Sequence, residues 1–85
     1  MKKFEYRVQD EVGMHARPAG MLVKEAKNYD SKIVIKANKK SAEATKLIAL
    51  MGLGIKKGHN IEVEITGVDE EKAYEGIKSF FENNL

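Results

Sequence analysis

One histidine in this sequence has neighbours that suit phosphoryl chemistry. His15 lies in the run Gly13-Met14-His15-Ala16-Arg17-Pro18-Ala19, where a loop turns into a helix. A neutral imidazole can attack a phosphoryl group and form a labile P–N bond without a metal ion. The free backbone N–H groups of a first helical turn, those of Ala16 and Arg17, can hold the phosphate that the imidazole acquires. The guanidinium of Arg17 adds a permanent positive charge for the same oxygens.

Both side chains also have ordinary roles. A histidine near the start of a helix is often only solvated, and Arg17 could pair with a nearby carboxylate such as that of Glu11. His59, the second histidine, lies between Gly58 and Asn60, and we expect it to be a solvated turn residue. The spacing alone leaves these alternatives open.

A second candidate feature is a cluster of large apolar residues. Leu47, Ile48, Leu50 and Met51 lie on a helix predicted over residues 46–51, barely two turns long. Core packing claims about half of them, and we expect Leu47, Ile48 and Met51 to include an exposed docking patch beside His15.

Several lysines could add a basic docking surface near this patch. Lys24 and Lys27 are the candidates on the helix that follows His15. Scattered lysines more often keep a protein in solution, so this assignment depends on where the fold places them.

The elements that must position these residues follow from the hydrophobic periodicity. Alternation predicts strands over residues 4–8, 33–37, 41–44 and 61–65, and helical periods predict helices from residue 16 to about 27, over 46–51 and from 69 to 81. Asn38-Lys39-Lys40 is expected to form a tight turn, although hairpins of this kind prefer glycine to lysine. The order is β-α-β-β-α-β-α. Strictly alternating strands imply a sheet covered on one face, which predicts an α+β open-faced β-sandwich.

The composition is that of one ordinary globular domain, residues 1–85. Hydrophobic residues make up 42% and charged residues 33% of the chain, and the net charge of +2 is too small to indicate nucleic acid or a membrane. The absence of cysteine excludes a disulfide framework and a thiolate metal site. There is no apolar leader, no membrane-spanning run and no metal or nucleotide motif, so we expect a cytoplasmic protein without a cofactor.

The run around His15 resembles the active-site signature of HPr, the histidine phosphocarrier family of the sugar phosphotransferase system. The likeness continues through Leu22-Val23-Lys24-Glu25-Ala26, Leu53-Gly54-Ile55 and Lys57-Gly58, and it covers essentially the whole chain. The resemblance implies a four-stranded antiparallel sheet under three helices. It also implies a monomer that carries a phosphoryl group and leaves catalysis of each transfer to its partners.

The resemblance implies that enzyme I, itself phosphorylated by phosphoenolpyruvate, would transfer the phosphoryl group to Nδ1 of His15. The carrier would then pass the group to the IIA domains of sugar permeases. Arg17 would match the family arginine that steadies the phosphate. Partners dock on the first two helices, which supports Leu47, Ile48 and Met51 as contact residues.

The sequence departs from the family at one regulatory position. Gram-positive relatives carry a serine just before the second apolar cluster, where a dedicated kinase phosphorylates it. In ungapped alignment from His15 that position is Lys46 here, and Thr45 is adjacent but out of register. Regulation by this kinase is therefore in doubt, while the relay through His15 is unaffected.

Three other functions compete with a general sugar relay. An HPr paralogue could serve a nitrogen-related or fructose branch, and the sequence does not tell which sugars are served. A small acylphosphatase-like enzyme would also combine an α/β sandwich with an arginine phosphate cradle, but it would not need His15 as nucleophile. An RNA-binding sheet domain is disfavoured because the strands lack exposed aromatic pairs.

Overall fold

A computed structural model describes all residues, 1–85, as four strands and three helices. The elements are β1 (Lys2–Arg7), α1 (Ala16–Ala26), β2 (Lys32–Ala37), β3 (Lys40–Glu43), α2 (Leu47–Met51), β4 (Asn60–Thr66) and α3 (Glu70–Asn84). Their order matches the predicted order.

The four strands form one antiparallel sheet in the order β1-β4-β2-β3. The register places Phe4, Val63, Ile35 and Ala42 in one row across the sheet, and all four side chains are buried. Because side chains alternate along each strand, this row and its neighbours make one apolar face.

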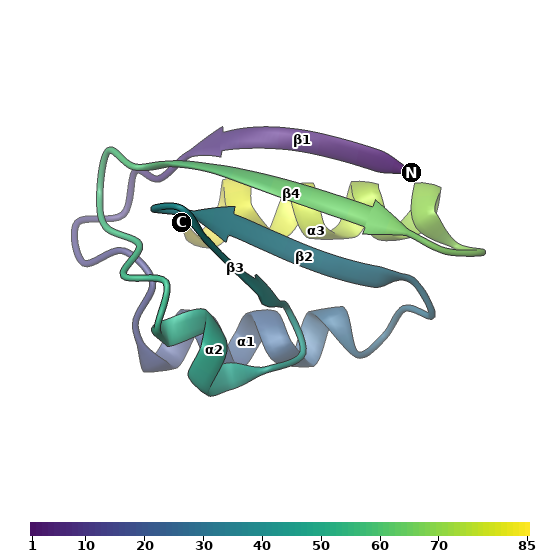
Figure 1. Ribbon diagram of the computed structural model, residues 1–85, viewed down its shortest axis with the longest axis horizontal. Helices are drawn as coiled ribbons and strands as arrows, with labels where there is room; N and C mark the ends of the chain where they lie inside the picture. Colours follow the sequence, from purple (N-terminus) through teal and green to yellow (C-terminus); the bar gives the residue numbers. More distant parts are fainter.

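The three helices cover that apolar face, as Figure 1 shows. The apolar stripe of α1 is buried through Ala19, Leu22 and Ala26, and α3 buries Ile77 and Phe81 against β1 and β4. Helix α1 contacts both α2 and α3, so α1 and α2 share one side of the molecule.

The opposite face of the sheet carries charged side chains. Lys3 lies 3.7 Å from Glu62, and Lys36 donates a hydrogen bond of 2.9 Å to Glu64. One covered face and one charged face confirm the predicted open-faced sandwich.

Some predicted boundaries are wrong by one to three residues: β1 begins at Lys2 rather than at residue 4, and α3 continues past residue 81 to Asn84. The third strand is Lys40–Glu43 rather than residues 41–44, because the hairpin turn has only two residues, Asn38 and Lys39. Both have a positive φ, 53° and 66°, as a type I′ turn requires. Lys46 and Asp69 precede α2 and α3 as capping residues instead of beginning these helices.

None of the three helices has both the length and the apolar character needed to cross a bilayer. No group of three or more His, Asp or Glu side chains is arranged to hold a metal ion.

Candidate functional site

His15 is the capping residue at the N-terminus of α1. Its backbone is extended, with φ −122° and ψ −173°, and its carbonyl accepts the Ala19 N–H at 2.9 Å. Pro18 fits the first helical turn because its missing N–H has no partner there in any helix. Neither ring nitrogen of the half-buried His15 makes a hydrogen bond, so the imidazole is free to react.

The first turn of α1 leaves two backbone donors unused. The N–H groups of Ala16 and Arg17 donate to no acceptor, and no side chain caps the helix. The turn also contains no acidic residue that would repel an anion. Two free N–H groups and the positive end of the helix therefore lie directly beside His15, where they can bind phosphate oxygens.

Arg17 is exposed and forms no ion pair. The alternative partner considered from sequence, Glu11, instead pairs with Lys57 at 2.8 Å. The guanidinium of Arg17 is thus an uncompensated positive charge two residues from His15.

The loop before His15 is held by hydrogen bonds to its own residues and to the loop before β4. The Asp10 carboxylate accepts the N–H groups of Val12 at 3.1 Å and Gly13 at 3.2 Å. The Met14 N–H donates to the Ile55 carbonyl at 3.0 Å. Gly13 has a φ of 77°, and a Cβ there would collide with the Ile55 carbonyl oxygen, so glycine is required at this position.

Helix α2 exposes most of its apolar residues. Leu50 is fully buried, whereas Leu47, Ile48 and Met51 are 38%, 79% and 39% exposed. The expected exposed patch therefore exists, on the helix that packs against α1. Lys24 on α1 and Lys27, which follows the last residue of α1, are exposed and form no ion pair.

The sequence analysis did not identify two exposed apolar residues in the segment that contains His15. Met21 on α1 is 44% exposed, and Val12 in the loop before His15 is 64% exposed. Met21 lies off the stripe of Ala19, Leu22 and Ala26, so the helical period that predicted the core could have identified it as an outward apolar side chain.

Lys46 caps α2 with an exposed side chain and makes no ion pair, while Thr45 is half-buried. The position before the apolar patch therefore carries an exposed positive charge and no hydroxyl.

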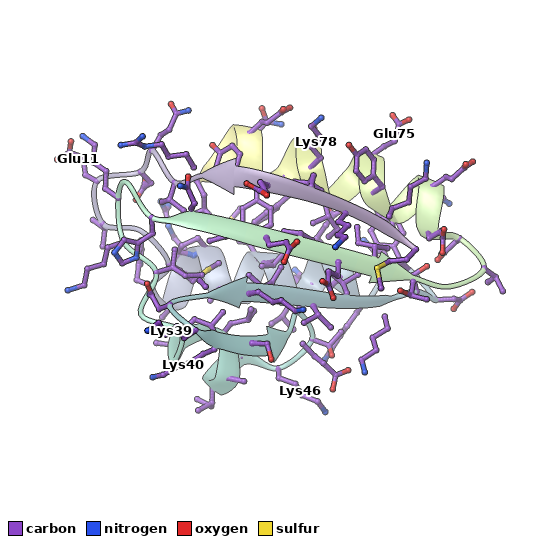
Figure 2. All side chains as sticks on the ribbon, turned by 45° about the horizontal axis from the view of Figure 1, so that its top comes forward. Glu11, Lys39, Lys40, Lys46, Glu75 and Lys78 are labelled. Carbon is purple, nitrogen blue, oxygen red and sulfur yellow. The ribbon has the colours of Figure 1, made fainter.

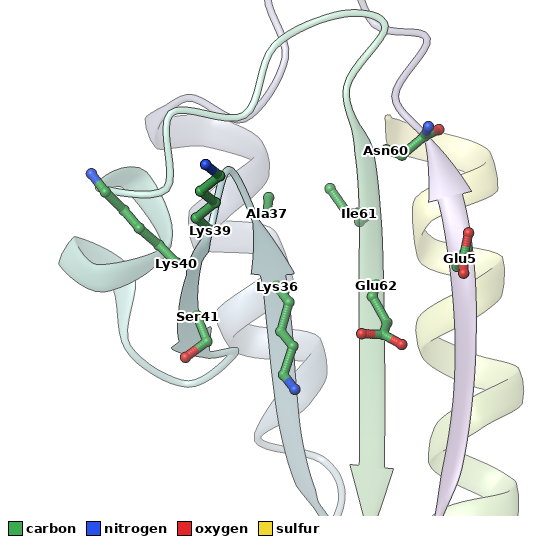
Figure 3. Close-up of a pocket in the computed structure, with 9 residues that line it drawn as sticks. All are labelled: Glu5, Lys36, Ala37, Lys39, Lys40, Ser41, Asn60, Ile61 and Glu62. Carbon is green, nitrogen blue, oxygen red and sulfur yellow. The ribbon is translucent and has the colours of Figure 1, made fainter.

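The surface hollows of the molecule do not include His15. The largest, about 530 Å³, lies on the open face of the sheet beside the β2–β3 hairpin, and Figure 3 shows its residues. It is lined by Glu5, Lys36, Ala37, Lys39, Lys40, Ser41, Asn60, Ile61 and Glu62. Sites for small molecules are usually concave and mostly apolar. His15 lies outside all three hollows, at the N-terminus of α1, the helix against which α2 packs.

His59 is more than a solvated turn residue. The ring Nδ1 of His59 accepts the backbone N–H of Lys56 at 3.1 Å, and the backbone N–H of His59 donates to the Lys56 carbonyl at 3.0 Å. Both histidines lie next to turns, but only the ring of His15 is without a partner.

Comparison with known proteins identifies the family of this chain. A sequence model of the family described as "PTS HPr component phosphorylation site" matches residues 2–83. The chain is 40% identical to the phosphocarrier protein HPr of Mycoplasma genitalium over 85 residues, with 99% of this chain and 97% of the relative covered. It is also 40% identical to HPr of Mycoplasma capricolum subsp. capricolum over 78 residues, with 92% and 88% covered.

Solved structures agree with the sequence relatives. A structure of the histidine-containing phosphocarrier protein from Mycoplasma superposes with a TM-score of 0.93 at 36% identity, covering 96% of this chain and 93% of that one. The structure of HPr from Bacillus anthracis strain Ames superposes with a TM-score of 0.87 at 29% identity, covering 94% of this chain and 95% of that one. The family match over residues 2–83 and the two relatives at 40% identity show that this chain belongs to the HPr family of phosphocarrier proteins.

Proposed function

We propose that His15 accepts a phosphoryl group at Nδ1 from phosphorylated enzyme I and passes it to the IIA domains of sugar permeases. The observation that carries the proposal is the surroundings of one imidazole. The ring of His15 has no hydrogen-bond partner, and two free N–H groups and an unpaired guanidinium lie within two residues of it.

The chemistry requires little of the carrier. The lone pair of Nδ1 attacks phosphorus, a P–N bond forms, and the bond between phosphorus and enzyme I breaks. The N–H groups of Ala16 and Arg17 and the guanidinium of Arg17 can then bind the anionic oxygens. In the transfer to a IIA domain, a bond forms between phosphorus and the IIA domain, and the P–N bond to His15 breaks. The same groups can bind the phosphate oxygens in both steps, so neither step needs a cofactor.

Docking is assigned to the exposed side of α1 and α2. Leu47, Ile48 and Met51 supply apolar contact area on α2, and Lys24 on α1 and Lys27 just after it supply positive charge. Exposed apolar groups surrounded by charge are typical of protein interaction sites. We infer that the protein acts as a cytoplasmic monomer, since a monomer leaves this side open to successive partners.

Regulation by a serine kinase has no acceptor at position 46. Lys46 has an amine where the family's regulatory serine has a hydroxyl, and its charge is opposite to that of a phosphate. We infer that the docking side stays permanently open to partners.

The test is phosphoryl transfer in a reconstituted relay. The purified protein is incubated with phosphoenolpyruvate and enzyme I, and a purified IIA domain is then added. The proposal predicts a phosphate on the protein that is labile in acid and stable in base, and its loss when the IIA domain is present. Failure to acquire phosphate would refute it, and hydrolysis of an acyl phosphate without enzyme I would favour the acylphosphatase alternative.

A further inference from the structure

We propose that His59 is a positioning residue for His15: its imidazole fixes the orientation of the Ile55–Lys56 peptide group, which in turn holds the backbone just before the phosphoryl acceptor. This inference rests on the proposed role of His15. It assigns a function to the second histidine, which takes no part in the transfer itself.

The Ile55–Lys56 peptide group is held at both ends. Its N–H, that of Lys56, donates to Nδ1 of His59 at 3.1 Å, and its C=O, that of Ile55, accepts the Met14 N–H at 3.0 Å. Because a peptide group is planar, rotation that frees one end also moves the other. Two hydrogen bonds in series through one amide also polarise each other. The His59 ring is therefore connected to Met14 through a single rigid unit.

A second side chain supports the same loop. Asn38 Nδ2, in the β2–β3 turn, donates to the carbonyls of Leu53 at 2.8 Å and Gly54 at 3.2 Å, and it lies 3.4 Å from Nδ1 of His59. The residues that precede the Ile55–Lys56 peptide are thus held from the hairpin, and the peptide itself is held from His59.

The loops before α1 and β4 are joined along their length. The Val8 N–H donates to the His59 carbonyl at 3.0 Å, and the Val8 carbonyl accepts the Gly58 N–H at 2.8 Å. A Cβ on Gly13 would lie 2.7 Å from the Lys56 Cα, so these two backbones are in direct contact. Any displacement of the Ile55–Lys56 peptide would therefore be transmitted to Gly13, Met14 and the residue that follows them, His15.

To hold the Ile55–Lys56 peptide group, the His59 ring must accept a hydrogen bond. Nδ1 is the acceptor, so the proton of the neutral ring lies on Nε2. Asparagine carries its side-chain oxygen at the place of Nδ1, whereas glutamine reaches the place of Nε2 and leucine has no acceptor. The identity of the side chain at position 59 can thus separate hydrogen bonding from simple space filling.

The test compares His59→Leu, His59→Gln and His59→Asn with the parent protein in two measurements. One is hydrogen exchange of the Met14 amide under native conditions. The other is the rate of phosphoryl transfer from enzyme I, resolved into kcat and KM. Asn60→Ala is the neighbouring control, since the exposed Asn60 side chain makes no hydrogen bond. Ser31→Ala is the stability control, because it removes a hydrogen bond beyond the other end of α1.

We expect His59→Leu and His59→Gln to exchange the Met14 amide about tenfold faster, the effect of losing one hydrogen bond. Their kcat for transfer should fall about tenfold with KM unchanged, because an acceptor displaced by a fraction of an ångström reacts more slowly while α1 and α2 still dock. His59→Asn should restore both values, and neither control should change them.

Parental kcat in both His59→Leu and His59→Gln would overturn the inference, as would parental exchange at Met14. Failure of His59→Asn to restore transfer would also overturn it, since space filling would then explain the loss. If the parent protein takes no phosphate, the proposed function fails by itself, and the role of His59 in transfer fails with it. The exchange data would still decide whether His59 fixes the peptide.

Discussion

His15 and His59 have identical side chains in different hydrogen-bonded surroundings. The ring of His15 has no partner and lies beside unused N–H donors, whereas Nδ1 of His59 accepts the Lys56 N–H. A nitrogen that already accepts a hydrogen bond must lose it before it can attack phosphorus. These surroundings favour His15 over His59 as the proposed nucleophile, a distinction that the residue type alone does not make.

Arg17 should matter for phosphoryl transfer and little for folding. Its guanidinium is exposed and unpaired in the free protein, so Arg17→Ala removes no contact that stabilises the fold. Losing one charge-assisted contact to phosphate should cost about 1.5–3 kcal/mol, a decrease of about tenfold to a hundredfold in transfer rate. Single-turnover transfer from enzyme I measures this, with Arg17→Lys as the variant that keeps the charge but loses the planar fork. Transfer by Arg17→Ala at the parental rate would make Arg17 an ordinary surface cation.

At the scale of elements, α2 is too short to bury all its apolar residues. Ile48 is 79% exposed, so Ile48→Asp should leave the melting temperature nearly unchanged. It should weaken binding to enzyme I about tenfold if this side chain is buried in the complex. Val68→Asp is the matched control, because Val68 is 92% exposed in the turn before α3. Equal binding by Ile48→Asp and Val68→Asp, measured by calorimetry, would remove α2 from the docking surface.

The start of α3 carries a pH-dependent contribution to stability. The Ser31 hydroxyl donates to Asp69 at 2.5 Å and the Asp30 N–H donates at 2.9 Å, and these bonds lower the pKa of the Asp69 carboxyl below its usual 3.8. A lowered folded pKa stabilises the fold above the usual value, and this stabilisation is lost as pH falls through the folded pKa. Ser31→Ala removes the largest cause, so its stability deficit should be full at pH 6 and should shrink below about pH 3.8. Urea unfolding across this range measures the deficit, and a constant deficit would exclude Asp69 as its source.

The elements were predicted well because each has one buried face. Alternation in residues 61–65 and the helical period of α1 report that face directly. The ends of elements depend on tertiary contacts that periodicity does not contain. Asp69 is an example. Its carboxylate does not cap α3 but accepts hydrogen bonds from the Asp30 N–H and the Ser31 hydroxyl, which lie 39 and 38 positions earlier in the chain.

Tertiary contacts likewise limited how much of the candidate site the sequence could predict. The positions of His15, Ala16 and Arg17 follow from local sequence, since all three belong to one helix start. The role proposed for His59 depends on Met14 and Lys56, which are brought together only by the fold. No local spacing indicates such a contact.

At the scale of the whole molecule, charge is divided between two regions. Residues 14–60 contain ten basic residues (lysine or arginine) and three acidic residues. Residues 61–85 contain two basic and seven acidic residues. The first region includes α1, α2 and the β2–β3 hairpin, and the second includes α3 and all of β4 except Asn60. In Figure 2, Lys39, Lys40 and Lys46 lie along the edge opposite Glu75. The net charge of +2 conceals this separation.

A positive docking side should attract an acidic partner surface at long range. The association rate with enzyme I should therefore fall about tenfold between roughly 20 mM and 300 mM salt, as the screening length shortens. A Lys24→Gln, Lys27→Gln double variant should show a smaller salt dependence, whereas Lys78→Gln on α3 should behave as the parent. Stopped-flow association measures the rates, and an association rate independent of salt would contradict electrostatic steering.

The most direct measurement is the location of the phosphate after reaction with phosphoenolpyruvate and enzyme I. Mass spectrometry under basic conditions can map it in the parent, in His15→Ala and in His59→Asn. We predict one phosphate on His15 in the parent and in His59→Asn, and none in His15→Ala. We expect His15→Ala to fold normally, since the half-buried ring of His15 caps no N–H group and makes no hydrogen bond. Phosphate on His59, or undiminished phosphorylation of His15→Ala, would contradict the assignment of His15 as the phosphoryl acceptor.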